Sequence, residues 1–79
     1  MDFFPGYRYC GPGKSGPGAP VNQLDAICMK HDACYKKNGS NRMCDEMFIN
    51  EIQPLINPYT KMGRDAAIMQ LAIKLKLTF

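Results

Sequence analysis

The sequence predicts a small all-α domain that is held together by disulfides. The chain has 79 residues, and a domain of this size buries only a modest core. Residues 1–20 contain four of the six prolines and five of the seven glycines, which predicts a loop. Three later stretches have the apolar spacing of amphipathic helices. We therefore predict a single domain, residues 1–79, with this loop, an antiparallel helix pair at 21–37 and 40–53, and a third helix at 60–77.

The opening loop is expected to adopt a defined shape, because glycine permits turns that aim backbone carbonyls inward. The first helix should begin at Val21 or Asn22, and Asn22 is a favourable N-cap. Asp25 stands at the capping-box position, near the positive end of the helix. The helix should end before the stop signal Asn38-Gly39. One face of this helix carries Leu24, Ile27, Cys28, His31 and Tyr35.

The second helix is expected to be capped by Ser40 or Asn41 and to run to about Gln53. The short connection before it predicts that the first two helices form an antiparallel hairpin. Its inner stripe is predicted to contain Cys44, Asp45, Phe48, Ile49 and Ile52.

The third helix follows a break that Pro54 and Pro58 enforce, and Thr60 is its expected N-cap. We interpret its apolar stripe as part of the core, with a membrane-lying face as the alternative. The stripe consists of Ala67, Ile68, Leu71, Ala72 and Leu75.

The four cysteines predict two disulfides, for which three pairings are possible. Disulfides in turn predict an oxidising compartment. The alternative is a zinc site in which Cys28, His31, Cys34 and Cys44 are the ligands. The sequence lacks the repeated Cys-x-x-Cys pairs of a zinc ribbon, which disfavours zinc.

The formal net charge of +3 and the sequence pI of about 8.7 favour anionic surfaces only weakly. Lysine and arginine are scattered along the chain, so we expect no nucleic-acid partner. No stretch approaches the roughly 18 apolar residues of a transmembrane helix. The N-terminus lacks the features of a signal peptide, so we expect that a signal was removed or that the domain belongs to a larger protein. Nothing in the sequence indicates an oligomeric state.

The adjacent pair His31-Asp32 carries the strongest chemical signal. Neighbouring residues point about 100° apart on a helix, so each side chain needs a separate role. His31 should face the second helix, where Asp45 can orient it as a general base. Asp32 should face the Gly-rich loop, and a carboxylate opposite backbone carbonyls is typical of a calcium site. The sequence therefore predicts a calcium-assisted hydrolase, in which the dication polarises an ester carbonyl.

Four short motifs occur in order between Tyr9 and Asp45, and together they resemble the His-Asp superfamily of phospholipases A2. The layout is most similar to the compact phospholipase A2 domain of parvoviral minor capsid proteins. The cysteines are more similar to those of secreted phospholipases A2. The motifs are Tyr9-Cys10-Gly11-Pro12-Gly13, Pro20-Val21 with Leu24-Asp25, His31-Asp32 with Cys34-Tyr35, and Cys44-Asp45.

The resemblance implies a calcium site made by the backbone carbonyls of Tyr9, Gly11 and Gly13 and both carboxylate oxygens of Asp32. The Gly11 amide would join the calcium ion as a donor to the oxyanion. Calcium is therefore the expected cofactor.

The resemblance also implies the catalytic roles. His31 would deprotonate the attacking water, Asp45 would hold the other ring nitrogen, and Tyr35 would hydrogen-bond Asp45. The implied disulfides are Cys10–Cys28 and Cys34–Cys44.

The implied reaction is hydrolysis of the sn-2 ester of glycerophospholipids, with a phospholipid membrane surface as the partner. The expected location is extracellular or in the endosomal lumen, as part of a secreted or viral capsid protein. The alternative is a catalytically inactive module of the same fold that binds membranes or proteins. Both members of His31-Asp32 and the glycines of the loop are present, which favours the enzyme.

Overall fold

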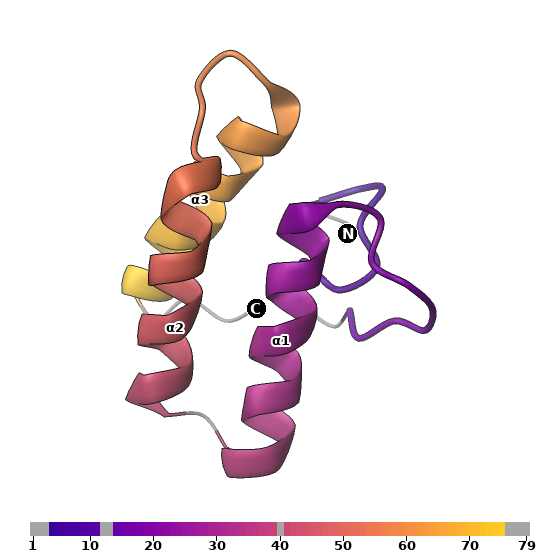
Figure 1. Cartoon of the computed structure of the whole chain (residues 1–79), viewed down its shortest axis with the longest axis vertical. Helices are drawn as coiled ribbons and strands as arrows, with labels where there is room; N and C mark the ends of the chain where they lie inside the picture. Colours follow the sequence, from indigo (N-terminus) through magenta and orange to yellow (C-terminus); the bar gives the residue numbers. More distant parts are fainter. Residues whose placement is uncertain (1–3, 12–13, 40, 76–79) are drawn as a thin grey trace.

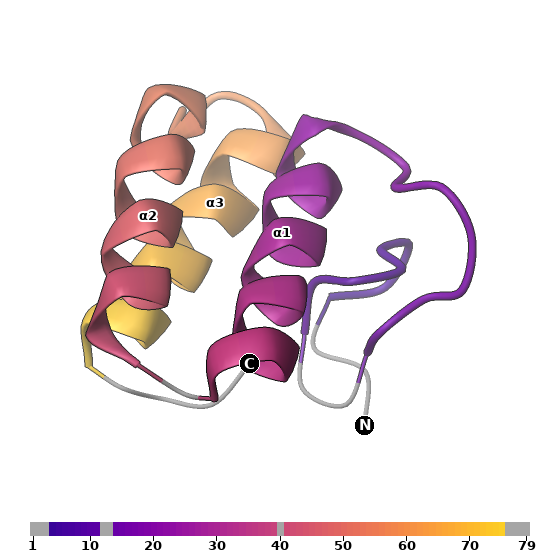
Figure 2. The ribbon, with the colours of Figure 1, turned by 60° about the horizontal axis from the view of Figure 1, so that its bottom comes forward.

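The computed structural model describes residues 4–11, 14–39 and 41–75. Helices α1 and α2 run antiparallel side by side, and α3 packs behind them (Figure 1). The N-terminal loop covers the side of α1 that faces away from α2 (Figure 2). No strand occurs in the described residues, which agrees with the predicted all-α fold. The elements are α1 (Gln23–Asn38), α2 (Arg42–Ile52), the 3-10 helix η1 (Gln53–Leu55) and α3 (Lys61–Lys74).

All three helices begin at a side-chain cap, as the sequence predicts. Asn22, Asn41 and Thr60 each accept a hydrogen bond from the backbone N–H three residues later, at 2.8, 3.0 and 3.0 Å. The first helix ends at Asn38 and is followed by the C-cap Gly39, whose φ of 74° suits glycine. The alternative cap Ser40 and the predicted end of the third helix at residue 77 lie outside the described residues.

The core lies where the three helices meet the N-terminal segment. In α3, Met69 reaches across to α1, and its sulfur lies 3.9 Å from the Cys28 sulfur. The buried amide of Gln70 donates to the Ile49 carbonyl at 3.3 Å and to the Gln53 side chain at 2.7 Å. The buried core residues are Phe4, Tyr7, Cys10, Leu24, Cys28, Phe48, Ile52, Ala66, Met69 and Ile73.

The prediction for the apolar stripe of α3 is largely wrong. Ile68, Leu71 and Leu75 are 54, 57 and 61 % exposed. The buried face instead passes through Ala66, Met69 and Ile73, which also lie at helical spacing. This helix has apolar residues on two opposite faces. The polar residue Gln70 lies on the buried face, so the sequence pattern did not identify that face as the one that packs in the core.

The two disulfides pair as the family resemblance implied. Cys10 is bonded to Cys28 and Cys34 to Cys44, with Cα–Cα distances of 5.2 and 5.8 Å. The structure has no free cysteine, so the zinc alternative is wrong. Both disulfides end on α1, which is therefore tied covalently to the loop and to α2.

Removing either disulfide should destabilise the domain strongly. The closed segments have sequence separations of 18 and 10 residues. Loop-closure entropy for such lengths is worth about 3 kcal/mol for each bond. Urea unfolding followed by circular dichroism, for the paired Cys→Ala variants, measures this loss. Free thiols in non-reducing peptide maps of the wild type would contradict the pairing.

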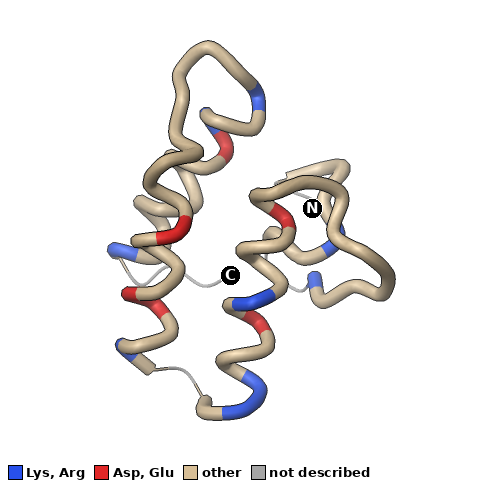
Figure 3. Tube along the Cα trace, viewed as in Figure 1, with Lys and Arg blue, Asp and Glu red and all other residues tan. Residues whose placement is uncertain are grey.

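Among the described residues, the positions of lysine and arginine are spread over the loop and all three helices (Figure 3). Within the described part of the chain, no helix is long and apolar enough to cross a membrane.

Candidate functional site

The helix hairpin brings His31 of α1 against Asp45 of α2. His31 Nε2 lies 3.0 Å from Asp45 Oδ1, and both residues are buried. The Cys34–Cys44 disulfide joins the same two helices next to this pair, because Cys44 directly precedes Asp45. The predicted pairing of the histidine with a carboxylate on the second helix is thus present in the structure.

The imidazole of His31 is fixed in orientation from several sides. The Tyr35 hydroxyl also donates to Asp45 Oδ1. The rings of Tyr35 and Phe48 lie 4.2 and 4.8 Å from the His31 ring, centroid to centroid. An ionised Asp45 can only accept hydrogen bonds, so its contact with Nε2 requires a proton on that nitrogen, and a neutral imidazole then has its lone pair on Nδ1.

Asp32 presents a carboxylate that has no protein partner for one of its oxygens. Its Oδ2 atom is buried and has no hydrogen bond within the described residues. Desolvation by burial raises the Asp32 pKa from 3.8 to about 6, although the charges of His31 and Lys36 lower it. A buried acceptor without a donor is costly, and a bound cation would remove that cost.

The surroundings of Asp32 fit calcium better than a metal that prefers side-chain ligands. No group of three or more His, Cys, Asp or Glu side chains able to hold a metal occurs among the described residues. A metal at Asp32 would need further oxygen ligands of other kinds, such as backbone carbonyls or water. Calcium accepts such carbonyl ligands readily.

Asp25 holds the N-terminal loop against α1 through four backbone amides. The N–H groups of Arg8, Tyr9 and Cys10 donate to Oδ1 at 3.1, 2.8 and 3.2 Å. The Val21 N–H donates to Oδ2 at 3.0 Å. Asp25 is fully buried, and burial by itself would raise its pKa. These amide hydrogen bonds more than offset that effect, so its pKa lies below the usual 3.8.

The partners of Asp25 differ from the capping box that we predicted from the sequence. Its carboxylate binds the loop, while the cap itself is the side chain of Asn22. A signal for this role was present, because Asp25 and Asp32 are seven residues apart and thus share one face of the helix. Asp25 also follows the fully buried Leu24 directly in the sequence, and a charged residue in a buried position needs partners.

The loop passes beside the turn of α1 that carries Asp32. Cys28, which binds Cys10, lies four residues before Asp32 and therefore on the same side of the helix. Gly11 is buried and has a φ of 118°, which is strained for other residues. A Cβ there would lie 3.6 Å from the Phe4 ring and 3.5 Å from the Lys14 side chain. The predicted ligand Gly13 lies outside the described residues.

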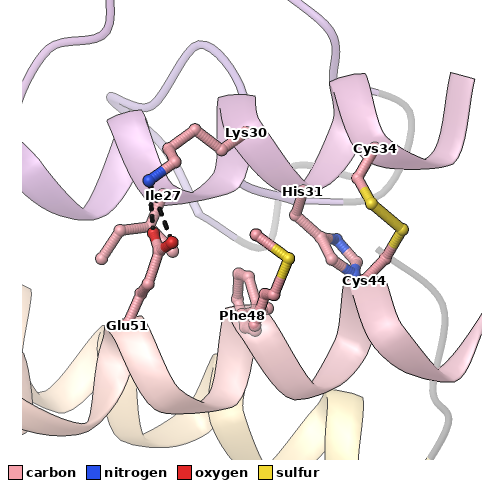
Figure 4. Close-up of a pocket in the computed structure, with 8 residues that line it drawn as sticks. Ile27, Lys30, His31, Cys34, Cys44, Phe48 and Glu51 are labelled. Carbon is pink, nitrogen blue, oxygen red and sulfur yellow. Dashed lines mark hydrogen bonds and ion pairs between the residues drawn. A yellow bond between two sulfur atoms is a disulfide. The ribbon is translucent and has the colours of Figure 1, made fainter. Parts of the chain in front are cut away.

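A small pocket opens between α1 and α2 beside the His31 ring (Figure 4). Its volume of about 20 Å³ can hold one water molecule and is too small for an acyl chain. The ion pair between Lys30 and Glu51, at 2.9 Å, bridges the two helices at its rim. A larger apolar groove of about 400 Å³ shares this ion pair and extends to Leu55.

The chain is similar in sequence to known proteins. A family model described as a phospholipase A2-like domain matches residues 3–76. The chain is 47 % identical over 36 residues to the acidic phospholipase A2 homolog taipoxin gamma chain of Oxyuranus scutellatus scutellatus, covering 46 % of this chain and 22 % of that protein. It is 50 % identical over 36 residues to a phospholipase A2 of Calliactis polypus, covering 46 % and 21 %.

A viral capsid protein is also similar. The chain is 39 % identical over 51 residues to capsid protein VP1 of Galleria mellonella densovirus, covering 60 % of this chain and 6 % of VP1. This chain thus spans less than a quarter of each of these relatives. No solved structure matches it significantly. The match over residues 3–76 shows that the chain belongs to the family of phospholipase A2-like domains.

Proposed function

We propose that the domain is a calcium-dependent phospholipase A2 that hydrolyses the sn-2 ester of glycerophospholipids. The observation that carries this proposal is the buried His31–Asp45 pair, with Asp32 as the next residue of α1, whose buried Oδ2 has no hydrogen bond within the described residues. Family membership and similarity to proteins named phospholipase A2 support it.

In the proposed mechanism, His31 is the general base. Its Nδ1 accepts a proton from water while the water oxygen bonds to the ester carbonyl carbon. Asp45 and Tyr35 hold the ring and stabilise the imidazolium that forms. The bond between the carbonyl carbon and the glycerol oxygen then breaks, and the proton passes from Nδ1 to that oxygen. The products are a fatty acid and a lysophospholipid.

The proposed calcium ligands are the Asp32 carboxylate and the backbone carbonyls of Tyr9, Gly11 and Gly13. When bound, the dication would supply positive charge that polarises the ester carbonyl and stabilises its oxygen in the transition state. The Gly11 N–H would donate to the same oxygen. The orphaned Oδ2 of Asp32 is the feature of this chain that supports the site.

The proposed partner is the surface of a phospholipid membrane, because the substrate is a membrane lipid. The proposed location is extracellular or in the endosomal lumen, in a secreted or viral capsid protein. The two disulfides support an oxidising compartment.

The decisive experiment measures fatty acid released from phospholipid vesicles with calcium or with EGTA. We expect release with calcium and none with EGTA. Vesicle binding is measured in the same samples. Binding without release would support the inactive module instead and contradict the proposed activity.

Calcium binding should weaken on acidification below about pH 6. The Asp32 pKa of about 6 means that protons compete with calcium below this pH. Affinity should fall by up to about tenfold for each pH unit below it. Calorimetric titration at pH 7, 6 and 5, with circular dichroism to follow folding, checks this. An affinity that is unchanged from pH 7 to pH 5 would contradict the role of Asp32.

A further inference from the structure

We infer that Asp25 is a positioning residue for the calcium site, because its carboxylate turns the peptide groups of the loop so that the Tyr9 carbonyl is presented to the cation. This inference rests on the proposed function. In the proposed mechanism, Asp25 does not contact the reacting atoms. Asp25 acts only by orienting the backbone of the loop.

The hydrogen bonds of Asp25 fix the direction of three consecutive carbonyls. The N–H groups of Arg8, Tyr9 and Cys10 all point at its Oδ1 atom. In a trans peptide, each N–H points opposite to the carbonyl of the preceding residue. The carbonyls of Tyr7, Arg8 and Tyr9 therefore point away from Asp25.

Two of these three carbonyls have donors inside the protein. The Tyr7 carbonyl accepts from the Lys14 ammonium at 3.2 Å. The Arg8 carbonyl accepts from the Gly16 N–H at 2.9 Å. No residue of the described ranges donates to the Tyr9 carbonyl. Of the three, Tyr9 is thus the carbonyl whose lone pairs are left for a cation.

The other contacts of the loop fix its position but leave this orientation to Asp25. The Cys10–Cys28 disulfide holds Cys10 beside α1, but rotation of the peptide groups on either side remains possible. The Tyr9 hydroxyl donates to the Gly18 carbonyl at 2.6 Å, which ties its ring to the outer part of the loop. The carboxylate of Asp25 is therefore the group that determines where the Tyr9 carbonyl points.

An asparagine at this position tests the idea with almost no change in volume. Its amide has one acceptor oxygen, and its NH₂ group cannot accept. Depending on the rotamer, the NH₂ group would face the Val21 N–H or the Tyr9 N–H, which now donate to the two Asp25 oxygens. Asp25→Asn should therefore release part of the loop backbone while the disulfides and helices remain.

The experiment compares wild type, Asp25→Asn and the control Glu51→Gln at low temperature. Glu51 is a carboxylate on α2 that pairs with Lys30, so its replacement removes the same charge away from the loop. We expect calcium affinity by calorimetry to fall at least tenfold in Asp25→Asn and to stay within twofold of wild type in Glu51→Gln. Amide exchange at Tyr9 and Cys10 should quicken in Asp25→Asn, with helical circular dichroism retained.

A measurement on the wild type covers the case in which Asp25→Asn does not fold. Calcium should shift the carbonyl ¹³C resonance of Tyr9 more than those of Tyr7 and Arg8. Equal shifts at the three carbonyls, or wild-type affinity in a folded Asp25→Asn, would overturn this inference alone. A wild-type domain that binds no calcium would instead overturn the proposed function.

Discussion

Asp32→Asn should abolish calcium-dependent hydrolysis and leave the calcium-free fold at least as stable as wild type. Asp32 is the only side chain among the proposed ligands, and the carbonyls carry no net charge. Without the carboxylate, the site has too little negative charge to hold a hard dication. We expect calcium binding to disappear in calorimetric titrations and fatty acid release to fall to the level measured with EGTA.

The effect on stability follows from the raised pKa of Asp32. The carboxyl ionises near pH 3.8 in the unfolded chain and near pH 6 in the folded one. Ionisation of Asp32 therefore costs the folded state no stability below pH 3.8. As the pH rises from 3.8 to about 6, the free energy of unfolding falls, and this loss of stability persists at neutral pH. Because Asp32 is partly solvent-exposed, we expect Asp32→Asn to gain only about 1 kcal/mol at pH 7.

Urea unfolding in EGTA measures this gain, and Glu46→Gln is a suitable control. Glu46 is an exposed carboxylate on α2 that pairs with Arg42, so its replacement should change neither stability nor calcium affinity. Calcium-dependent hydrolysis that persists in Asp32→Asn would show that Asp32 is not a ligand.

His31→Ala should lose turnover while keeping calcium binding, because the base and the metal ligand are different residues. Loss of a general base costs about 10²- to 10⁴-fold in rate. Asp45→Asn should cost less, about 10- to 100-fold, because it misorients the imidazole without deleting it. Rates on one vesicle substrate and calcium titrations for each variant test this order.

The burial of His31 requires a second substitution at this position. Its ring packs between Tyr35 and Phe48, so His31→Ala leaves a cavity and lowers stability. His31→Gln fills more of that space and has no basic nitrogen, so it should fold better and remain inactive. Near-wild-type rates in either variant would exclude His31 as the base. An Asp45→Asn variant that is folded yet slower than His31→Ala would reverse the assigned roles.

The sequence predicted those structural features that depend only on residues close to one another along the chain. The caps Asn22, Asn41 and Thr60 satisfy backbone groups within three residues, so their chemistry is visible in the sequence. The pairing of His31 with Asp45 follows from a short connection between two helices of known period.

Features that depend on distant segments were not predictable in the same way. The α3 helix has two apolar faces, and only its packing against α1 and α2 selects the one with Met69 and Ile73. Three of the four amide partners of Asp25 lie 15 to 17 residues earlier, in a loop without periodicity. The disulfide pairing came from family resemblance, because spacing alone allows three pairings.

The two disulfides fasten the proposed metal site and the proposed base to α1 independently of each other. The segments that they close, residues 10–28 and 34–44, follow one another along the chain without overlap. Reduction of Cys10–Cys28 therefore removes the covalent link between the loop and α1 and leaves noncovalent contacts such as those of Asp25, while the cross-linked hairpin keeps His31 beside Asp45. Reduction of Cys34–Cys44 loosens the hairpin and leaves the loop attached. Loss of one of the two bonds thus weakens the support of the proposed metal site or of the proposed base without cutting the covalent link that supports the other.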